Sequence, residues 1–590
     1  MPQITAQPAS QTVTVGQAAT FSVAATGTAP LLYQWSRNGS SIAGATAASF
    51  TISSAQLSDS GASFTVVVSN AAGKATSTAA KLTVNKAAAG TDVVTYKYDA
   101  MRTGQNLTET VLTPANVTSA AFGLLRNLKV DGLVDAQPLY LSALLMSGTS
   151  HNVVFIATEH DSVYAFDSDS GAQLWRVSLI GSGEAPSDDH GCVQVSPEIG
   201  ITSTPVIDRS AGSHGTIFLV AMTKDASAQY HQRLHALDVT TGVELAGSPV
   251  ELAATFGSTS FDPGQYTERA ALLLVNKTIY TSFTSHCDGA PYGGWVISLS
   301  ESSLAPAGAI NLANGASGAG FANQGPAIWM SGGGPAADAA GNVYVLTANG
   351  KFDSLNPAGF PAYGDYGNSF VKISSTGSAL MVSDYFSMDD ELAESQNDVD
   401  LGSGGIMLLP DQTDAGGTIR HLAVGGGKDG NLYVVNRDNM GKFKSTSNAV
   451  WQEIDGALLN GIWSTPAYYN SNVYYGPTGG PLLMFPISGA MLAAAPSSQT
   501  GTQFIYPGTF PVISANGSAN GIVWAYENAS TAVLHAYSAA NLAKELYNSN
   551  QAAGGRDHFG TGNKFIAPVV ADGKVFVATT GGVGVFGLLH

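Results

Sequence analysis

Charged residues are scarce in this chain, and basic residues are scarcer than acidic ones. Of 590 residues only 12% are charged, with 25 Lys and Arg against 43 Asp and Glu, and the formal net charge is −18 at pH 7. A surface of this sign repels nucleic acid and anionic membranes at long range. The hydrophobic runs are all of strand length, short of the roughly 20 residues that a membrane-spanning helix needs. The composition therefore argues against nucleic acid as a partner and predicts no membrane insertion.

A secretory signal is also missing from the sequence. The first residues, "MPQITAQPAS", lack the basic and apolar regions of a signal peptide. Composition and the domain types described below nevertheless favour export. We therefore expect a secreted or cell-surface monomer, numbered after a signal that has been removed.

Residues 1–85 have the pattern of a small antiparallel sandwich. Apolar and polar positions alternate, as in "ATFSVAA" and "ASFTVVVSN", between regularly spaced turn residues. Trp35 in a central strand, followed by "SDSGASF", resembles an immunoglobulin-like domain in which Val23 and Val66 stand where the inter-sheet cysteines would be. We expect the core to rest on packing around Trp35 alone. The sequence leaves open whether this domain is a spacer or a binding module, and residues 86–95 are expected to form a linker.

Residues 96–590 contain an internal repeat of short strands. A proline marks the start of the presumed innermost strand in six units, where a missing ladder donor is tolerated. These prolines are Pro138, Pro205, Pro335, Pro466, Pro511 and Pro568. The gaps 205–335 and 335–466 each contain one further unit without the proline. Six plus two units predict an eight-bladed β-propeller.

The last unit ends the chain without a fourth strand. A strand-like segment, "FGLLRNLKVDG" at residues 122–132, precedes the first unit. Pairing the two would remove an open sheet edge, so we expect this segment to complete the last blade and residues 96–121 to lie outside the ring. The predicted fold class is all-β, with an N-terminal immunoglobulin-like sandwich followed by an eight-bladed propeller closed by an N-terminal outer strand.

One repeat carries a recognisable motif. "YAFDSDSGAQLW", residues 164–175, resembles the blade repeat of the quinoprotein dehydrogenases, propellers that oxidise alcohols with pyrroloquinoline quinone. "TEHDSVYAFD" and "GKDGNLYVVNRDN" are similar to segments of bacterial secreted proteins described as quinoprotein-like. "DSDSG" forms either an ordinary turn or the front of a calcium loop. The resemblance extends to the fold further than to the chemistry.

The cofactor of those dehydrogenases has incomplete support. The resemblance implies a quinone beside a ring of adjacent cysteines and over a tryptophan, with a calcium or lanthanide ion bound by Glu, Asn and Asp. This chain has no adjacent cysteines and no Cys-x-x-Cys-His haem motif, although sugar-oxidising quinoproteins also lack the cysteine pair. We assign no cofactor and keep quinone with calcium as an alternative. Trp329 and Trp463 either line the channel or pack between blades.

The long polar segments are predicted to share one face. Linkers between blades and loops between second and third strands emerge at the same end of the inner strands, and such loops commonly form sites. The residues expected on this rim are His160, Asp161, His190, His231, Arg269, His286, Asp288, Tyr292, Asp353, Asp400, Lys428, Asp429, Arg556 and His558.

Particular rim residues are assigned roles. Arg269 and Lys428 are candidate anchors for an anionic group such as a carboxylate. His160 and His286, each near an Asp, are candidate general bases, and Tyr292 is a candidate catalytic partner. The other candidate ligand-binding residues are Asp161, Asp288, Asp400, Asp429, Arg556 and His558. We assign none of them to a metal.

The two cysteines, Cys192 and Cys287, fall on the same predicted face. In a secreted protein they most simply form a disulfide. The alternative is a zinc site, because His190 and His286 stand beside them.

These features predict an extracellular binding protein that recognises a glycan or cell-envelope polymer on the loop-rich propeller face. One alternative is a lyase or hydrolase acting on an acidic polysaccharide. The other is a quinone-dependent dehydrogenase. The sequence leaves open whether the protein is an enzyme.

Overall fold

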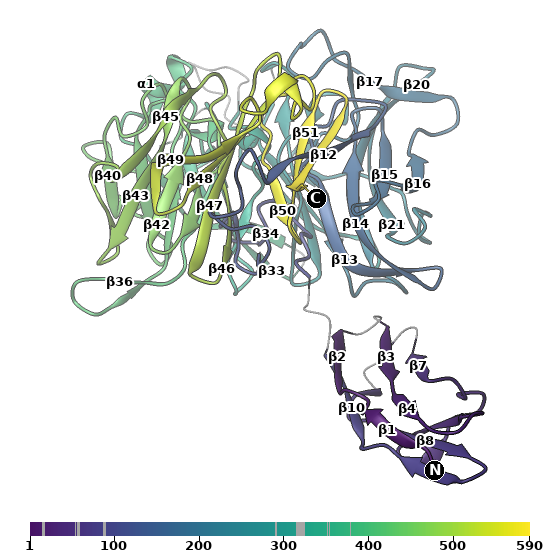
Figure 1. The fold of residues 1–590 in the computed structure, drawn as a ribbon. Coiled ribbons are helices and arrows are strands. Elements are labelled where there is room, and N and C mark those ends of the chain that lie inside the picture. The colour runs from purple at the N-terminus through teal and green to yellow at the C-terminus, as the bar shows by residue number, and fades with distance from the viewer. Residues whose placement is uncertain are drawn as a thin grey trace. The chain divides into compact units, whose positions relative to one another are not determined.

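The computed structural model comprises two compact units, Met1–Gly90 and Thr91–His590. It describes all residues except 15–17, 53–54, 56–58, 86–89, 290–291, 314–324, 351, 353, 378 and 590. Both units consist of strands and loops (Figure 1), and the described residues contain one short α-helix, α1 (Glu391–Gln396). The 3-10 turns are Met330–Gly332, Leu401–Ser403 and Ala553–Gly555. No described helix is long and apolar enough to cross a membrane.

The first unit is a sandwich of short strands, antiparallel except that β2 pairs parallel with β10. Its larger sheet has the order β2-β10-β8-β5-β6 with β9 on β8, while β3 pairs with β7 and β1 with β4. The strands are β1 (Gln3–Ala6), β2 (Gln11–Thr14), β3 (Ala19–Ser22), β4 (Ala24–Thr26), β5 (Leu32–Arg37), β6 (Ser40–Ser41), β7 (Ser49–Ile52), β8 (Ser63–Asn70), β9 (Gly73–Thr76) and β10 (Ala80–Asn85).

The core of this unit is shared among several aromatic rings. Trp35 is fully buried and lies opposite Val66 in the β5–β8 register. Its ring centre is 6.5 Å from that of Phe21, which stacks on Phe64 at 4.5 Å. The expectation of a core resting on Trp35 alone is therefore wrong, because phenylalanines of β3 and β8 fill the space between the sheets.

The second unit repeats an antiparallel sheet of four strands, and its described residues form eight such sheets. The first four contain β13 (Leu139–Met146), β14 (Thr149–Ala157), β15 (Ser162–Asp167) and β16 (Gln173–Ser178); β19 (Val206–Asp208), β20 (Thr216–Asp225), β21 (Tyr230–Asp238) and β22 (Val250–Glu251); β26 (Leu273–Val275), β27 (Thr278–Ser282), β29 (Trp295–Ser300) and β30 (Pro306–Asn311); and β31 (Ala336–Ala337), β32 (Val343–Leu346), β33 (Ser369–Thr376) and β34 (Ala379–Ser387).

The next four complete the series. They contain β35 (Met407–Leu408), β38 (Leu422–Gly425), β39 (Leu432–Asn436) and β40 (Gln452–Ile454); β41 (Ala467–Tyr469), β42 (Asn472–Tyr475), β43 (Gly480–Ser488) and β45 (Ser498–Phe504), with β44 (Met491–Leu492) also on β43; β46 (Val512–Asn516), β47 (Ala519–Glu527), β48 (Val533–Ser538) and β49 (Asn541–Asn548), with β11 (Gln105–Asn106) on β46; and β50 (Val569–Ala571), β51 (Lys574–Thr579), β52 (Gly582–Leu588) and β12 (Phe122–Lys129).

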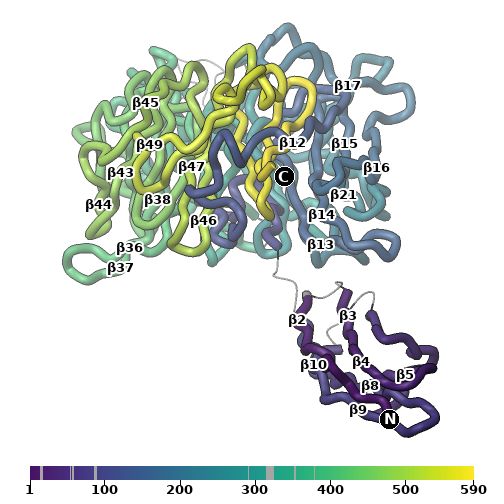
Figure 2. Tube along the Cα trace, viewed as in Figure 1, coloured from purple at the N-terminus to yellow at the C-terminus, as the bar shows by residue number. Residues whose placement is uncertain are grey.

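Short strands outside the repeat lie in the connections. They are β17 (Glu184–Asp188), β18 (Glu198–Ile199), β23 (Thr255–Phe256), β24 (Thr259–Ser260), β25 (Tyr266–Thr267), β28 (Thr284–Ser285), β36 (Gln412–Thr413) and β37 (Ile419–Arg420). Figure 1 shows α1 and β17, both in linkers between sheets, at the same end of the unit. The β36–β37 hairpin projects at the other end (Figure 2).

The proline marker coincides with the innermost strand in all six units that carry it. In each, the proline is the residue directly before the strand, as Pro138 is before β13 and Pro568 is before β50. The missing N–H therefore falls just outside the ladder. The two units without a proline begin their inner strands at β26 and β35, within the gaps where they were predicted.

The last sheet is completed by an N-terminal strand. β12 pairs antiparallel with β52, from Phe122 opposite Leu588 to Lys129 opposite Gly582, and Figure 2 shows it against the C-terminal segment. The first and last sheets are also in contact, because the Tyr140 hydroxyl donates to Asp572 at 3.0 Å. The predicted closure by an outer strand from before the first unit is confirmed.

The segment before β12 does not lie outside the ring as predicted. Residues 93–106, here called the plug, contact the beginning of the inner strand of every sheet in the series. These contacts are Val93 with Tyr140, Val94 with Ile207, Arg102 with Leu272, Ala100 with Ala337, Met101 with Leu408, Thr103 with Tyr468, Gly104 with Ile513, and Asn106 with Val570. The prediction failed because these residues show no strand periodicity, and their contacts come from backbone groups, the Asn106 side chain and two buried cations.

Lys97 and Arg102 anchor the plug, and both are fully buried. The Lys97 ammonium donates to the carbonyls of Thr465, Pro466 and Pro511 at 2.6 to 3.0 Å. Burial lowers the pKa of Arg102 to about 10, and its guanidinium donates to carbonyls that include Pro335 O and Leu272 O. The inner strands of different sheets are thus cross-linked through the plug.

The repeat motif at residues 164–175 supports packing between sheets. Asp167 Oδ1 accepts from the amides of Asp169 and Ser170, which makes "DSDSG" an ordinary turn. The Trp175 indole donates to Val239 O in the next sheet at 3.1 Å. The motif therefore connects blades.

Candidate functional site

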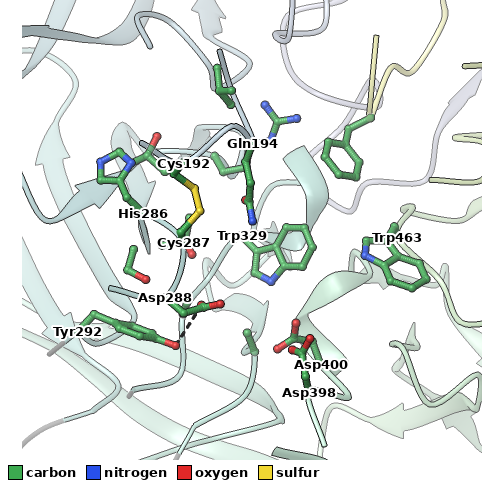
Figure 3. A pocket seen from close by; sticks show the side chains of 18 of the residues that line it. Cys192, Gln194, His286, Cys287, Asp288, Tyr292, Trp329, Asp398, Asp400 and Trp463 are labelled. Carbon is green, nitrogen blue, oxygen red and sulfur yellow. Dashed lines mark hydrogen bonds between the residues drawn. A yellow bond between two sulfur atoms is a disulfide. The ribbon is translucent and has the colours of Figure 1, made fainter. Parts of the chain in front are cut away.

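A cavity of about 300 Å³ lies where the linkers between sheets converge (Figure 3). Its described walls come from loops within the sheets and from the linkers before seven inner strands. One lining residue from each, in chain order, is Cys192, Arg269, Trp329, Asp400, Trp463, Tyr506 and Phe565. The cavity is therefore enclosed by consecutive sheets.

Eight residues predicted from the sequence line this cavity. They are Cys192, Arg269, His286, Cys287, Asp288, Tyr292, Asp400 and Lys428. The sequence argument grouped them because their loops share one end of the sheets, and the structure brings them around one opening.

The two cysteines form a disulfide. Cys192 and Cys287 are joined with their Cα atoms 5.6 Å apart, which ties the linker after β17 to the loop after β28. The zinc alternative does not fit, since the thiols are consumed and no group of three or more His, Cys, Asp or Glu among the described residues could bind a metal. Figure 3 shows the disulfide next to His286.

His286 is neutral at physiological pH. Its ring stacks on His190 with centres 3.8 Å apart. Burial first, and then the neighbouring His190, lower the pKa of His286 to about 4. Nε2 donates to the Tyr266 carbonyl at 3.1 Å, which leaves Nδ1 as the ring nitrogen with a free lone pair. The imidazole can accept a hydrogen bond or, weakly, a proton.

Tyr292 and Asp288 form a pair at the cavity wall. The Tyr292 hydroxyl donates to Asp288 Oδ1 at 3.2 Å (Figure 3). Burial and then the Asp288 charge raise the pKa of Tyr292 well above its usual value. The phenol stays protonated, so it can donate a hydrogen bond but is a poor general base.

Arg269 carries a positive charge into the cavity wall. Its side chain is 8% exposed, its Nη1 is 3.3 Å from Asp135 Oδ1, and its Cζ is 4.9 Å from the centre of the Phe565 ring. Nη1 has no hydrogen-bond partner among the described residues. The guanidinium is therefore fixed by one carboxylate and one ring while retaining hydrogen-bonding capacity.

Lys564, which the sequence argument did not assign, lies behind the same wall. It donates to Gln194 O at 2.9 Å. Burial, followed by the Arg269 charge, lowers the pKa of Lys564. Glu159 does not offset these cations, because burial and Asp135 raise its pKa well above the usual value. This side of the cavity therefore holds two cations, Arg269 and Lys564, beside the Asp135 carboxylate.

Lys428 lies between two carboxylates. Its ammonium is 2.8 Å from both Asp398 Oδ1 and Asp400 Oδ2. Burial alone would lower the pKa of Lys428, but Asp400 and Asp398 raise it. The prediction of Lys428 as an anchor for an anion finds little support, because its charge is already matched within the chain.

Aromatic rings form much of the remaining wall. Trp463 meets Tyr506 edge to face at 5.7 Å, and Trp329 meets Phe565 edge to face at 6.3 Å. Both tryptophans line the cavity, which is the first of the two alternatives considered from the sequence. Tyr506 is 47% exposed and marks the mouth.

Five candidates do not belong to the described lining of the cavity: His160, Asp161, Asp429, Arg556 and His558. The β14–β15 hairpin tip is covered by the following linker, where Glu198 pairs with His160 Nδ1 at 2.9 Å. Asp161 is buried beneath it and burial raises its pKa well above the usual value.

The other three have local partners or lie elsewhere. Asp429 accepts from the Tyr433 hydroxyl at 2.7 Å. Arg556 donates to Ser119 O and Phe122 O at the start of β12, and the neighbouring His558 is exposed. Among the other rim residues, His231 pairs with Glu251 and His190 stacks on His286, while Asp353 lies outside the described residues.

Comparisons with known proteins give a match for the fold of each unit. Residues 2–84 match the model of the immunoglobulin I-set domain. No curated protein matches the chain. The fold of the second unit is that of the quinoprotein dehydrogenase propellers. The chain is similar to the quinohemoprotein alcohol dehydrogenase of Comamonas testosteroni, at 16% identity and a TM-score of 0.55 over 84% of this chain and 80% of that one.

Two further solved structures give the same result. Quinohemoprotein alcohol dehydrogenase ADHIIG of Pseudomonas putida HK5 is 13% identical, with a TM-score of 0.55 over 84% of this chain and 80% of that one. A europium-containing methanol dehydrogenase is 14% identical, with a TM-score of 0.52 over 83% of this chain and 90% of that one. At these identities the likeness concerns the fold alone.

The quinone alternative is tested by the residues present. Trp329 and a disulfide line the cavity, but the disulfide joins cysteines 95 residues apart and not the adjacent pair that the resemblance implies. The donors for its metal ion do not fit, because Asp398 and Asp400 are paired with Lys428, and Asp288 accepts from Tyr292. No described cluster of His, Cys, Asp or Glu is arranged to bind a metal. We therefore derive no step through a quinone and its ion.

Proposed function

We propose that the cavity of the second unit binds an acidic sugar unit of an extracellular glycan, with Arg269 as the anchor for its carboxylate. The observation that carries this proposal is the Arg269 guanidinium in the cavity lining, whose Nη1 is 3.3 Å from Asp135 Oδ1 but forms no hydrogen bond among the described residues. Arg presents paired donors that match a carboxylate, and such hydrogen bonds are among the stronger ones in proteins. The neighbouring Lys564 adds to the positive potential.

The remaining walls suit a polyhydroxylated ring. The apolar face of a sugar packs on aromatic rings such as Trp329, Trp463 and Tyr506. The carboxylates of Asp398 and Asp400, lying together in Figure 3, offer acceptors for hydroxyl groups in addition to their bonds to Lys428. The pocket thus combines one anion anchor with stacking surfaces and hydroxyl acceptors.

Binding is favoured over proton-transfer chemistry in this proposal. A lyase would need a base strong enough to remove a proton beside the carboxylate. His286, with its pKa lowered to about 4, and Tyr292, whose pKa is raised, are both poorly suited to that role at neutral pH.

The predicted location of the protein outside the cell agrees with the disulfide, which persists in oxidising compartments. We further infer that the eight sheets are the blades of one closed eight-bladed propeller.

Calorimetric titration with uronate oligosaccharides and with neutral oligosaccharides of the same length tests the function. The wild-type protein is expected to prefer the uronates. Arg269→Gln should weaken uronate binding by about 10- to 100-fold, because a charge-assisted hydrogen bond contributes roughly 1.5–3 kcal/mol. Arg209→Gln, a surface arginine paired with Asp92, is the matched control and should bind as the wild type does.

Two results would contradict the proposal. One is equal affinity for neutral and acidic oligosaccharides. The other is no glycan binding at all together with dye reduction by protein reconstituted with quinone and calcium. Because Arg269→Gln leaves Asp135 without its partner, Trp463→Ala, elsewhere in the cavity lining, provides a second variant, checked by its unfolding temperature.

A further inference from the structure

The plug lies directly below the cavity. Arg269, Trp463 and Phe565 each precede their inner strand by four residues, whereas the plug contacts the beginning of those same strands. An extended residue spans about 3.3 Å, so these cavity-lining residues are at most about 13 Å from the strand starts that the plug contacts. The hydroxyl of Tyr96 in the plug is 3.4 Å from Thr465 Oγ1, only two residues beyond Trp463. The plug therefore forms a floor across the ring of inner strands beneath the cavity, although none of its residues is among the described lining.

This floor leaves no passage through the ring of inner strands. Tyr96, Lys97, Arg102, Thr103 and Asn106 are all at most 2% exposed. The Lys97 ammonium and the Arg102 guanidinium each donate to carbonyls directly before two inner strands, which holds the floor in contact with its surroundings. A ligand can neither enter nor leave at this end.

The walls also surround the cavity. Lining residues come from seven consecutive linkers between sheets, and the eighth contributes Asp135, which contacts Arg269 from behind. At about 300 Å³, the volume is at the lower end of ligand pockets, which range from about 300 to 1,000 Å³. The cavity is a pit with a floor rather than a groove across the face.

A pit of this kind discriminates between the end and the interior of a polymer. An interior unit is bonded on both sides, so both neighbouring units would have to leave through the same mouth, and the chain would have to reverse direction inside the pit. A terminal unit has one neighbour and needs no reversal. Resting on the proposed function, we propose that the cavity binds the terminal unit of an acidic glycan and does not bind interior units.

The test compares oligouronates of two, four, eight and sixteen units by calorimetric titration. If only the end binds, affinity per chain stays constant beyond the shortest oligomers and the stoichiometry remains one. Two modified sets, one reduced at the reducing end and one capped at the non-reducing end, identify the recognised terminus. One modification should reduce binding by at least 10-fold while the other leaves it unchanged. Arg269→Gln should weaken every length by the same factor.

The outcomes separate the two proposals. Affinity per chain that rises in proportion to length, with neither end modification having an effect, would show interior binding and overturn the terminal assignment while leaving the function intact. Failure of every oligouronate to bind would overturn the proposed function and the terminal assignment with it. Loss of binding on modification of both ends would indicate recognition of a whole short oligomer and would also contradict the inference.

Discussion

The two ends of the propeller channel use the same inner strands for different purposes. At the plug end, the buried cations are fully engaged, because Lys97 donates to three carbonyls and Arg102 to several more. At the cavity end, Arg269 Nη1, Thr267 Oγ1 and Ser285 Oγ are buried without described partners. Satisfied polar networks rigidify a fold, whereas unmet hydrogen-bonding groups commonly mark a functional site. The difference supports a stabilising role for the plug end and the proposed ligand binding at the cavity end.

Removing β12 should reduce the stability of the second unit more than any other change proposed. Without Phe122–Lys129 the last sheet keeps three strands and β52 becomes an open edge. Phe122, which packs on Trp524, Tyr547 and Phe586, is lost as well. We expect aggregation or loss of cooperative unfolding, measured by size-exclusion chromatography and calorimetry. Deleting residues 1–90 is the control and should leave the propeller transition in place. An unchanged unfolding temperature without β12 would show that the sheet assignment is wrong.

Lys97→Met tests the plug directly. The methionine fills a similar space but leaves three buried carbonyls without their donor, each costing roughly 1–3 kcal/mol, so the free energy of unfolding should fall by about 3 kcal/mol or more. Lys444→Met, at an exposed lysine in the same unit, is the control and should be nearly neutral. Denaturant unfolding of the two variants measures the difference. A similar small effect for both would mean that the plug contributes little to stability.

Much of the fold could be predicted because its signals are local. Each proline marker falls directly before an inner strand, and "FGLLRNLKVDG" is recognisable as a strand in need of a partner. The plug gives no such signal. Its contacts are spread over eight sheets. From the sequence alone, Lys97 and Arg102 would be expected at the surface, and the structure is needed to show their carbonyl partners.

The candidate site was predicted only in part, because the position of a loop is a local signal whereas the partners of its side chains come from distant segments. Loop position grouped Arg269, His286 and Lys428 correctly at one opening, but it could not show that the linker carrying Glu198 covers His160 or that Asp398 and Asp400 neutralise Lys428. One usable signal was overlooked. Arg269 and Trp463 both stand four residues before an inner strand, and the same offset from β50 identifies Phe565, next to Lys564.

The disulfide provides a test of both stability and binding at the cavity end. Cys192 and Cys287 are 95 residues apart, and a cross-link of such a loop typically contributes about 2–4 kcal/mol, largely through the unfolded chain. We expect the double variant Cys192→Ser, Cys287→Ser to unfold at lower temperature and to lose uronate affinity, since both residues line the cavity. Wild-type protein treated with reductant should behave in the same way. Unchanged stability and binding after complete reduction would show that the bridge shapes neither.

The smallest expected effect is the pH dependence contributed by His286. Its pKa in the folded protein is lowered to about 4, by burial first and then by His190, from an ordinary value near 6.5. Between these two values the unfolded chain binds more protons at this residue than the folded protein does, so the stability from keeping His286 neutral is present above pH 6.5 and is lost as the pH falls to about 4. His286→Gln removes that titration and should flatten the dependence of unfolding free energy on pH within this window, whereas His558→Gln, at an exposed histidine outside the described cavity lining, should not. Chemical denaturation of the three proteins at pH 4.5, 5.5, 6.5 and 7.5 measures the slopes. Identical slopes for wild type and His286→Gln would mean that His286 takes up a proton as readily in the folded protein as in the unfolded chain. Water would then reach this side chain, and the burial that lowers its pKa would be absent in solution.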